Sequence, residues 1–337
     1  MNRVQKDISS ITDIKELFAP LDGRSIMITG ATGLIGSMMT KVLCDAKLKY
    51  GLNIRIICQV RDLAKAEKML GDLEIEFTED FSTPCDFLIH TASPTSSKFF
   101  IEHPVETIRA SVENTIKALE AAAKNGTNVV YLSSMEEYGV PYEAGQIMTE
   151  DKVGIVDHLN IRSCYPESKR LCECLCASYA SEYGLNVKIA RLAQTFGAGQ
   201  PLTDGRLPMQ LARSSKEGKD IVLHTEGKSI SNFVYLSDAI TGLLTIMLKG
   251  EAGQAYNVCN DKETRSVRSI AELVASEVSG GKIDVLIDIP EENMGYALDA
   301  ALYLNSDKLR SLGWKAEVTM AEAYRRLIEY IRESDNQ

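Results

Sequence analysis

The chain has 337 residues, of which 45% are hydrophobic and 25% charged, and its net charge is −10. This length is sufficient to bury a large core, in one large or two unequal domains. The acidic balance argues against nucleic acid as the main partner, because phosphate binding requires a basic face, and no uninterrupted apolar run approaches the length of a membrane span.

Residues 1–21 alternate charged and apolar groups and lack the apolar core of a signal peptide, so we expect a short leading helix and a cytoplasmic protein. The eight cysteines have no disulfide-framework spacing. Cys172, Cys174 and Cys176 lie two apart in a predicted helix, where this spacing splays the side chains around the axis. We therefore expect buried thiols and no metal site.

A short apolar run at residues 25–29 precedes a glycine-rich turn at 30–36 and a helical stretch that continues to about Lys49. Glycines in such a turn let the backbone approach a pyrophosphate at the N-terminus of the helix, where amide groups and the helix dipole favour anions. The pattern of strand, glycine-rich turn and helix predicts a dinucleotide-binding unit.

Apolar runs then alternate with helical stretches, which is typical of a Rossmann-type doubly wound parallel sheet. We expect strands at residues 53–60, 74–77, 86–92 and 128–134, and helices at residues 64–70 and 105–124. Ligands of such sheets bind at the carboxyl ends of the strands. Ser93, Ser133 and Ser134 fall at those ends.

The end of the second strand usually selects the cofactor, because an acid there holds the ribose of NAD and an arginine accommodates the extra phosphate of NADP. Gln59 or Val60 occupies the expected acidic position, Arg61 follows, and Asp62 is within reach of the ribose. We expect NAD, and Arg61 leaves NADP open.

Tyr165 and Lys169 are four residues apart, which is one helical turn, so their side chains point the same way. An ammonium beside a phenol favours the phenolate, which predicts a lowered tyrosine pKa and a base for a sugar hydroxyl. The Tyr-x-x-x-Lys pattern alone is common in helices. Its position after the glycine-rich turn and after the motif at residues 133–139 makes it a strong signal.

Together these residues resemble the extended short-chain dehydrogenase/reductases of the NAD-dependent epimerase/dehydratase type, which act on nucleotide sugars. The resemblance covers roughly residues 24–330. It rests on motifs at residues 29–36, 90–94, 114, 133–139, 165–169, 191–197, 233–238 and 312–314. Within this family, the chain most resembles the UDP-glucuronate decarboxylases, with shared pieces at residues 92–94, 114–116, 162–165, 169–170 and 204–206.

The resemblance implies a role for each catalytic candidate. Tyr165 deprotonates the C4 hydroxyl of the sugar, and Lys169 tunes it and binds the nicotinamide ribose. Ser134 shares the hydrogen bond to the substrate, and Glu136 lies near C5 and C6. The implied cofactor contacts are Gly30, Thr32, Gly33, Leu34, Ile35, Gly36, Arg61, Thr91, Ala92, Ser93, Asn114, Tyr165 and Lys169. The implied substrate contacts are Ser93, Gln194 and Arg206.

Three positions depart from the family pattern. Met135 stands where dehydratases carry an aspartate that protonates the leaving hydroxyl, and a thioether cannot donate a proton. Ser231 stands where decarboxylases carry an arginine that contacts the substrate, which weakens the decarboxylase interpretation. Gln194 replaces a common asparagine and makes the same hydrogen bonds from a longer arm.

The implied chemistry passes through a transient 4-keto sugar, which leads to decarboxylation or to C4 epimerisation. The partner is a nucleotide-diphosphate sugar, and many relatives form homodimers through the helices at 105–124 and 165–183. A net NADP-dependent carbonyl reductase of the same superfamily is the alternative, which Arg61 supports. A non-catalytic binding module is disfavoured, because Ser134, Tyr165 and Lys169 are all present.

The chain shows no clear linker, so its division into parts is approximate. We expect an N-terminal extension at residues 1–23 and an NAD(P)-binding Rossmann domain at 24–190. Residues 191–337, which have a less regular pattern, are expected to form a smaller α/β region that mainly binds substrate, and the chain is expected to cross back between the two parts.

Overall fold

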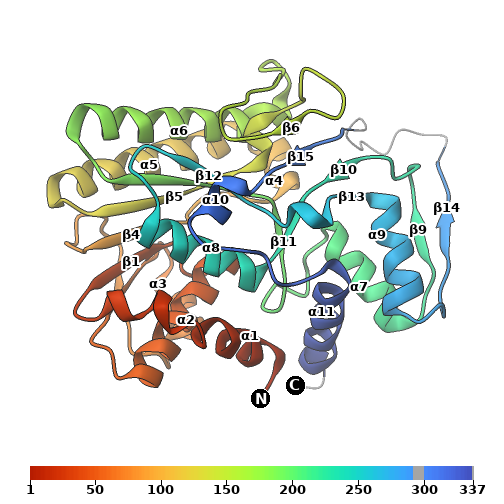
Figure 1. Ribbon diagram of the computed structural model, residues 1–337, viewed down its shortest axis with the longest axis horizontal. Helices are drawn as coiled ribbons and strands as arrows, with labels where there is room; N and C mark the ends of the chain where they lie inside the picture. The colour runs from red at the N-terminus through yellow and green to blue at the C-terminus, as the bar shows by residue number, and fades with distance from the viewer. Residues whose placement is uncertain (291–299, 336–337) are drawn as a thin grey trace.

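The computed structural model describes residues 1–290 and 300–335, and its centre is a seven-stranded parallel sheet (Figure 1). The strands lie in the order β12-β7-β5-β4-β1-β2-β3. Their bounds are β1 Ser25–Thr29, β2 Arg55–Gln59, β3 Glu76–Thr78, β4 Phe87–His90, β5 Asn128–Ser134, β7 Val187–Leu192 and β12 Ala255–Val258. The predicted Rossmann-type doubly wound sheet is confirmed.

Strands of a buried parallel sheet need apolar side chains on both faces, and β1 shows how this sheet meets that need. Ile26 and Ile28 pack into the larger core, whereas Met27 packs into a second core on the opposite face. The larger core is covered by α2 (Leu34–Tyr50), α3 (Leu63–Leu70) and α8 (Leu236–Lys249). The opposite face is covered by α5 (Pro104–Asn125) and α6 (Cys164–Tyr183), so the sheet is the middle of three layers (Figure 1).

The last two strands of the sheet were not assigned from the sequence. β7 follows α6 and pairs with β5, and β12 pairs in parallel with β7 more than sixty residues further along the chain, with Ala255 opposite Ile189. The chain therefore leaves the large sheet after β7 and returns to it at β12.

The N-terminal segment is a helix, as expected, and it packs against the body of the protein. α1 (Arg3–Thr12) contributes Ile8 and Ile11 to the larger core, and the short 3-10 helices η1 (Lys15–Leu17) and η2 (Ala19–Leu21) follow. Asp7 is almost fully buried and accepts hydrogen bonds from the Tyr235 hydroxyl at 2.7 Å and from Arg326 at 3.2 Å. This carboxylate ties the first helix to the C-terminal region.

The C-terminal region is a smaller α/β unit with a core of its own, which includes Phe196, Phe233, Tyr235 and Tyr324. Its helices are α7 Leu207–Glu217, α9 Val267–Leu273, the π-helical η6 Val274–Val278 and α11 Met320–Asp335. Its paired strands are β8 Gln194–Phe196 with β11 Phe233–Tyr235, β9 Ile221–Leu223 with β14 Val285–Ile287, and β10 Ile230–Ser231 with β13 Arg265–Ser266.

The connections carry the remaining elements, which are α4 Ser97–Glu102, η3 Met135–Tyr138, η4 Ile161–Ser163, η5 Asp261–Glu263 and α10 Asp307–Ser311, together with the paired strands β6 Ile147–Met148 and β15 Tyr303–Leu304. α4 follows β4, η3 follows β5, and η4 leads directly into α6. These three short helices therefore lie beside the carboxyl ends of strands, where the sequence places the candidate site.

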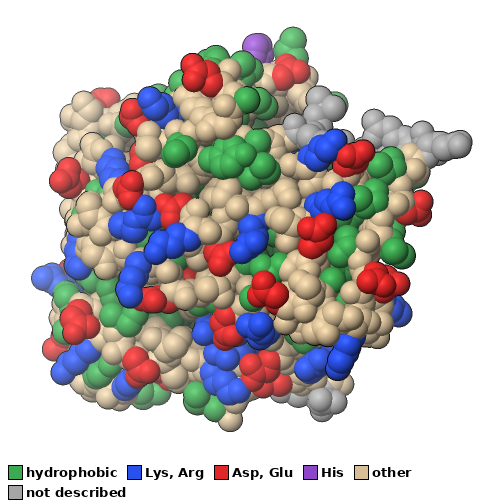
Figure 2. All heavy atoms as spheres, turned by 45° about the vertical axis from the view of Figure 1, so that its right-hand side comes forward, with side chains coloured by type: hydrophobic (Ala, Val, Ile, Leu, Met, Phe, Trp, Pro, Cys, Tyr) green, Lys and Arg blue, Asp and Glu red, His purple; other side chains and the backbone are tan. Residues whose placement is uncertain are grey.

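On the face shown in Figure 2, basic and acidic side chains are interspersed among apolar ones. Within the described residues, no helix is both long and apolar enough to span a bilayer. The same residues contain no cluster of three or more His, Cys, Asp or Glu side chains arranged to hold a metal. Cys172 and Cys176 are buried, as expected, whereas Cys174 is exposed, because a two-residue spacing on a helix turns its side chain away from the other two.

Candidate active site

The glycine-rich turn is closely packed against the neighbouring backbone. Gly30 has φ +64°, and a Cβ atom there would lie 2.8 Å from the Thr91 hydroxyl oxygen. A Cβ atom on Gly36 would lie only 2.4 Å from the carbonyl oxygen of Gly30. α2 begins directly after Gly33, so the N–H groups of its first turn have no partner within the helix and are available to an anion.

Side chains at the ends of β1 and β4 hold the two strands together beside this turn. The Thr91 hydroxyl donates to the Thr29 carbonyl at 2.6 Å, and the Ala92 N–H donates to the Thr29 hydroxyl at 3.1 Å. The Ser93 hydroxyl lies 3.3 Å from that of Ser111 on α5. One turn further along α5, Asn114 donates to the carbonyl of Ala110 at 2.7 Å. The predicted contacts Thr91 and Ala92, which directly follow β4, therefore lie beside the glycine-rich turn at 30–36, which also contains Thr32, Leu34 and Ile35.

The end of β2 carries the residues expected to select the cofactor, and the structure gives each of them a different environment. Arg61 is exposed. The Asp62 carboxylate accepts the Lys65 N–H at 2.9 Å and thereby caps α3. Gln59 is buried and donates to the Glu79 carbonyl at 3.2 Å. Of these residues, Arg61 and Asp62 are exposed, and the Asp62 carboxylate is engaged as the cap of α3.

Tyr165 and Lys169 both lie in the first half of α6 and are almost fully buried. The Lys169 ammonium donates to the Leu132 carbonyl at 2.8 Å and lies 5.7 Å from the centroid of the Tyr165 ring. Burial lowers the pKa of Lys169 to about 8, because the charged form is poorly solvated there.

The predicted lowering of the Tyr165 pKa is wrong for this structure. Burial raises the pKa of Tyr165 well above its ordinary value, and the nearby Glu136 carboxylate raises it further. A hydrogen bond with Ser134 and the positive charges of Arg162 and Arg206 oppose this increase without cancelling it. The physical reason is that desolvation of the phenol outweighs these favourable charges, while the ammonium of the predicted partner is directed to a backbone carbonyl.

The predicted Ser134 and Glu136 lie beside Tyr165 because β5 ends there and η3 begins. The Ser134 hydroxyl accepts the Glu136 N–H at 3.2 Å and caps η3. The Glu136 side chain is 38% exposed and accepts a hydrogen bond from Arg162 at 2.8 Å. The structure therefore brings together a phenol, a hydroxyl and a carboxylate at the end of one strand.

Phe100 and Arg162 are neighbours of this group that the sequence analysis did not identify. The fully buried Phe100 ring from α4 stacks on the Tyr165 ring, with centroids 4.4 Å apart and an interplanar angle of 12°. The Arg162 guanidinium lies 4.8 Å from the centroid of the Phe100 ring. No local sequence signal predicts this stack, because its members come from separate connections.

A buried charged cluster beneath the site was also missed. Arg191 on β7 makes two-pronged hydrogen bonds to Glu173 on α6, the closest at 2.7 Å, and its Nε lies 3.1 Å from a carboxylate oxygen of Glu137. Burial and the adjacent Glu173 raise the pKa of Glu137 to about 7. The signal that would have revealed the cluster is an arginine within the otherwise apolar second half of a buried strand.

The predicted substrate residues of the C-terminal region are exposed. Gln194 begins β8. Arg206 is paired with Asp204 at 2.8 Å and donates to the Thr195 carbonyl at 3.3 Å, so an anionic ligand would compete with a carboxylate for it. The two departures Met135 and Ser231 touch each other, with the serine hydroxyl 3.8 Å from the thioether sulfur.

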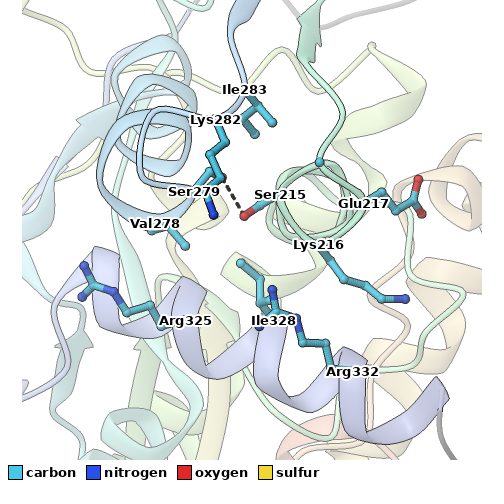
Figure 3. A pocket seen from close by; sticks show the side chains of 11 residues that line it. Ser215, Lys216, Glu217, Val278, Ser279, Lys282, Ile283, Arg325, Ile328 and Arg332 are labelled. Carbon is cyan, nitrogen blue, oxygen red and sulfur yellow. Dashed lines mark hydrogen bonds between the residues drawn. The ribbon is translucent and has the colours of Figure 1, made fainter.

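A cavity of about 440 Å³ lies elsewhere, between α7, η6 and α11. Figure 3 shows Lys282 and Arg332 directed into it and Ser215 hydrogen-bonded to Ser279. None of the predicted catalytic, cofactor or substrate residues lines it. We therefore place the candidate site at the strand ends around Tyr165 and not in this cavity.

The model of the NAD dependent epimerase/dehydratase family matches residues 26–259. UDP-glucuronic acid decarboxylase 1 of Xenopus tropicalis is 28% identical over 319 residues, which cover 92% of this chain and 73% of the relative. UDP-glucuronic acid decarboxylase 6 of Arabidopsis thaliana is 28% identical over 306 residues, which cover 88% of this chain and 85% of the relative.

Solved structures show the same fold. The epimerase Mth375 from Methanothermobacter thermautotrophicus superposes with a TM-score of 0.78 at 21% identity, over 97% of this chain and 96% of that structure. The likeness therefore extends beyond the cofactor-binding half and includes the smaller C-terminal region.

Proposed function

The chain belongs to the NAD-dependent epimerase/dehydratase family, and from this premise we propose that it is a redox-neutral enzyme acting on a nucleotide-diphosphate sugar. The reaction we propose is decarboxylation of a nucleotide-linked hexuronate through a 4-keto sugar, as the names of the two relatives suggest. C4 epimerisation is the second candidate, because Ser231 stands where decarboxylases carry an arginine.

The residues of the glycine-rich turn fit the cofactor. The backbone cradle at Gly30 and Gly36 leaves no room for a Cβ atom, and the first turn of α2 offers N–H groups to a pyrophosphate. When bound, NAD accepts a hydride from the sugar and returns it. Arg61, exposed at the end of β2, keeps NADP as a second candidate cofactor.

The observation that carries the proposal is the gathering of Ser134 and Glu136, which are bonded to each other at the end of β5, beside the buried Tyr165, whose pKa both side chains influence. The Tyr165 phenol is the group that exchanges the proton of the C4 hydroxyl, and Ser134 holds that hydroxyl in place. Glu136 is the second acid or base, positioned to act at the neighbouring carbons once C4 is a ketone. Lys169, beneath the phenol, places a positive charge near the developing phenolate.

The test is to incubate the purified protein with UDP-glucuronate and NAD and to follow the sugar by proton NMR. Formation of UDP-xylose or of its 4-keto precursor supports decarboxylation and means that Ser231 does not disable the site. Inversion to UDP-galacturonate with the carboxylate retained supports the epimerase candidate instead. No reaction with any nucleotide sugar, combined with consumption of NADPH on a carbonyl substrate, would favour the reductase alternative.

We further propose a homodimer formed through α5 and α6. Val105 and Ile108 on α5 and Leu171 on α6 are apolar and exposed, and the two helices pack side by side in the chain (Figure 1). Burial of such side chains favours association. A cytoplasmic location is part of the same proposal, because nucleotide sugars are the expected substrates.

The division of labour that we propose follows the chain. Residues 24–190 bind the cofactor, residues 191–337 mainly bind the substrate, and residues 1–23 form an extension. β12 belongs to the large sheet although it lies within the second range. With this division, the cofactor and the sugar would meet at the carboxyl ends of the strands.

A further inference from the structure

Arg162 is placed by a short, well-anchored connection next to the candidate catalytic residues. It belongs to η4, where the Asn160 side chain accepts the Arg162 N–H at 2.9 Å. The neighbouring Ser163 hydroxyl donates to the Asp157 carbonyl at 2.6 Å. These bonds fix the backbone from which the Arg162 side chain extends before any ligand binds.

The guanidinium of Arg162 is held on two sides. On one side it donates to Glu136 at 2.8 Å, and on the other it lies over the Phe100 ring at 4.8 Å. Phe100 stacks in turn on Tyr165. Cation, phenyl ring and phenol therefore form one stack, which keeps a positive charge at a fixed place relative to the proposed base.

This charge is accessible and has spare hydrogen-bonding capacity. The side chains of Arg162 and Glu136 are 34% and 38% exposed, so the pair faces solvent. Within the described residues, the guanidinium donates a single hydrogen bond, through Nη2, although it carries five N–H groups. A carboxylate that approaches the pair would meet donors that are already oriented.

The other cation that acts on Tyr165 is less available. Arg206 also opposes the increase in the Tyr165 pKa, but its Nε and Nη2 both bond to the carboxylate of Asp204, at 3.0 and 2.8 Å. The residue before Glu136 in the chain, Met135, touches Ser231, which brings no charge. Of these neighbours, Arg162 is the one that can neutralise a second carboxylate beside Glu136.

We propose that Arg162 is the binding residue for the carboxylate of a hexuronate substrate. This inference rests on the proposed function and specifies its substrate class. When the anionic sugar binds, the guanidinium shifts from Glu136 to the sugar carboxylate. The guanidinium neutralises the incoming carboxylate, which reduces its repulsion with Glu136, and Glu136 is released from its ion pair next to the reacting carbons. A neutral hexose lacks the group that would draw Arg162 away.

The test compares two probes that differ at C6 alone, UDP-glucuronate and UDP-glucose, by calorimetric titration of the NAD-loaded protein. We expect Arg162→Gln to weaken UDP-glucuronate binding by about ten- to a hundredfold, the loss typical of a hydrogen bond to a charged group, and to change UDP-glucose binding less than about threefold. Arg55→Gln is the matched control. Its guanidinium also pairs with a glutamate, Glu76, at 2.7 Å, but at the amino end of a strand.

A second comparison, made in the Glu136→Gln variant, distinguishes direct binding of the sugar carboxylate by Arg162 from a role limited to positioning Glu136. In Glu136→Gln protein, Arg162→Gln should still weaken UDP-glucuronate binding selectively if the guanidinium contacts the sugar carboxylate. No further loss in that background, or an equal loss for both probes, overturns the inference while the proposed function stands. If the unaltered protein binds neither probe, the proposed function itself fails.

Discussion

Single side chains decide the chemistry at the strand ends, and Tyr165 is the most direct case. Tyr165→Phe removes the hydroxyl that we propose exchanges a proton with the sugar and keeps the ring that stacks on Phe100. We expect turnover to fall by at least about a thousandfold, in line with the loss of an essential acid or base, while NAD binding is retained. Steady-state kinetics and cofactor titration measure both quantities. Tyr183→Phe, exposed on the same helix, is the control; unchanged turnover in Tyr165→Phe would contradict the assignment.

Glu137 predicts a pH dependence of stability. Its pKa is raised from 4.5 to about 7, first by burial and then by Glu173. Between these values the folded protein binds a proton that the unfolded chain has released, so this group favours the folded state at low pH and loses that contribution as the pH rises to about 7.

Glu137→Gln stays neutral, so the variant should lack this component of the pH dependence. Urea unfolding at about pH 5 and about pH 8 should show wild type losing stability relative to the variant at the higher pH. Glu143→Gln, at an exposed position, serves as control. A constant difference between wild type and Glu137→Gln at both pH values would argue that Glu137 is already ionised in the folded protein.

At the scale of elements, the turn between β1 and α2 depends on two backbones that nearly touch. Gly36→Ala introduces a Cβ atom 2.4 Å from the Gly30 carbonyl oxygen, so the first turn of α2 must shift. We expect NAD affinity to fall by more than about tenfold, because the N–H groups that we propose receive the pyrophosphate move with it. Leu48→Ala, exposed on the same helix, should bind normally; equal NAD affinity for Gly36→Ala, with the fold intact by circular dichroism, speaks against the turn as the cofactor site.

The contact of α1 with the C-terminal region includes one buried carboxylate, that of Asp7. Asp7→Ala leaves the Tyr235 hydroxyl and Arg326 without their shared acceptor. We expect the free energy of unfolding to fall by about 3 kcal/mol, the cost of breaking a buried ion pair from one side. Denaturant titration measures the change. Asp13→Ala, whose side chain is 72% exposed and pairs with Lys49, should change stability by less than about 1 kcal/mol.

For the molecule as a whole, the proposed dimer predicts a change in mass. Val105→Glu combined with Leu171→Glu places charges on the exposed faces of α5 and α6 and should convert a dimer to a monomer in light scattering after size exclusion. Leu48→Glu, on a helix outside the proposed interface, should leave the mass unchanged. A monomeric unaltered protein would remove the basis of the dimer proposal.

The sequence predicts the first five strands of the large sheet because they are short segments, most of them apolar, that are spaced among helical stretches. β7 and β12 were not assigned. β12 has four residues, and its place is decided by pairing with a strand far away in the chain. The pattern of residues within a four-residue segment does not reveal which distant strand it pairs with.

The candidate site shows the same division. Ser134, Glu136 and Tyr165 are brought together as their motifs suggest, since strand ends and the start of a helix fix them. The stack of Arg162, Phe100 and Tyr165 and the cluster around Arg191 depend on contacts between distant segments and were missed. The predicted low pKa of Tyr165 failed because spacing reveals a neighbouring charge and not the burial that opposes it.

The docking of α1 also has a consequence for the order of folding. The Arg3 N–H donates to Glu333 at 2.7 Å, and Asp7 bonds to Arg326, so contacts join positions more than three hundred residues apart (Figure 1). During synthesis the first helix leaves the ribosome before α11, which contains Arg326 and Glu333, has been made. We expect its contacts with α11 to form last, after its packing against α2, so the joining of the two chain ends marks the completion of the native structure.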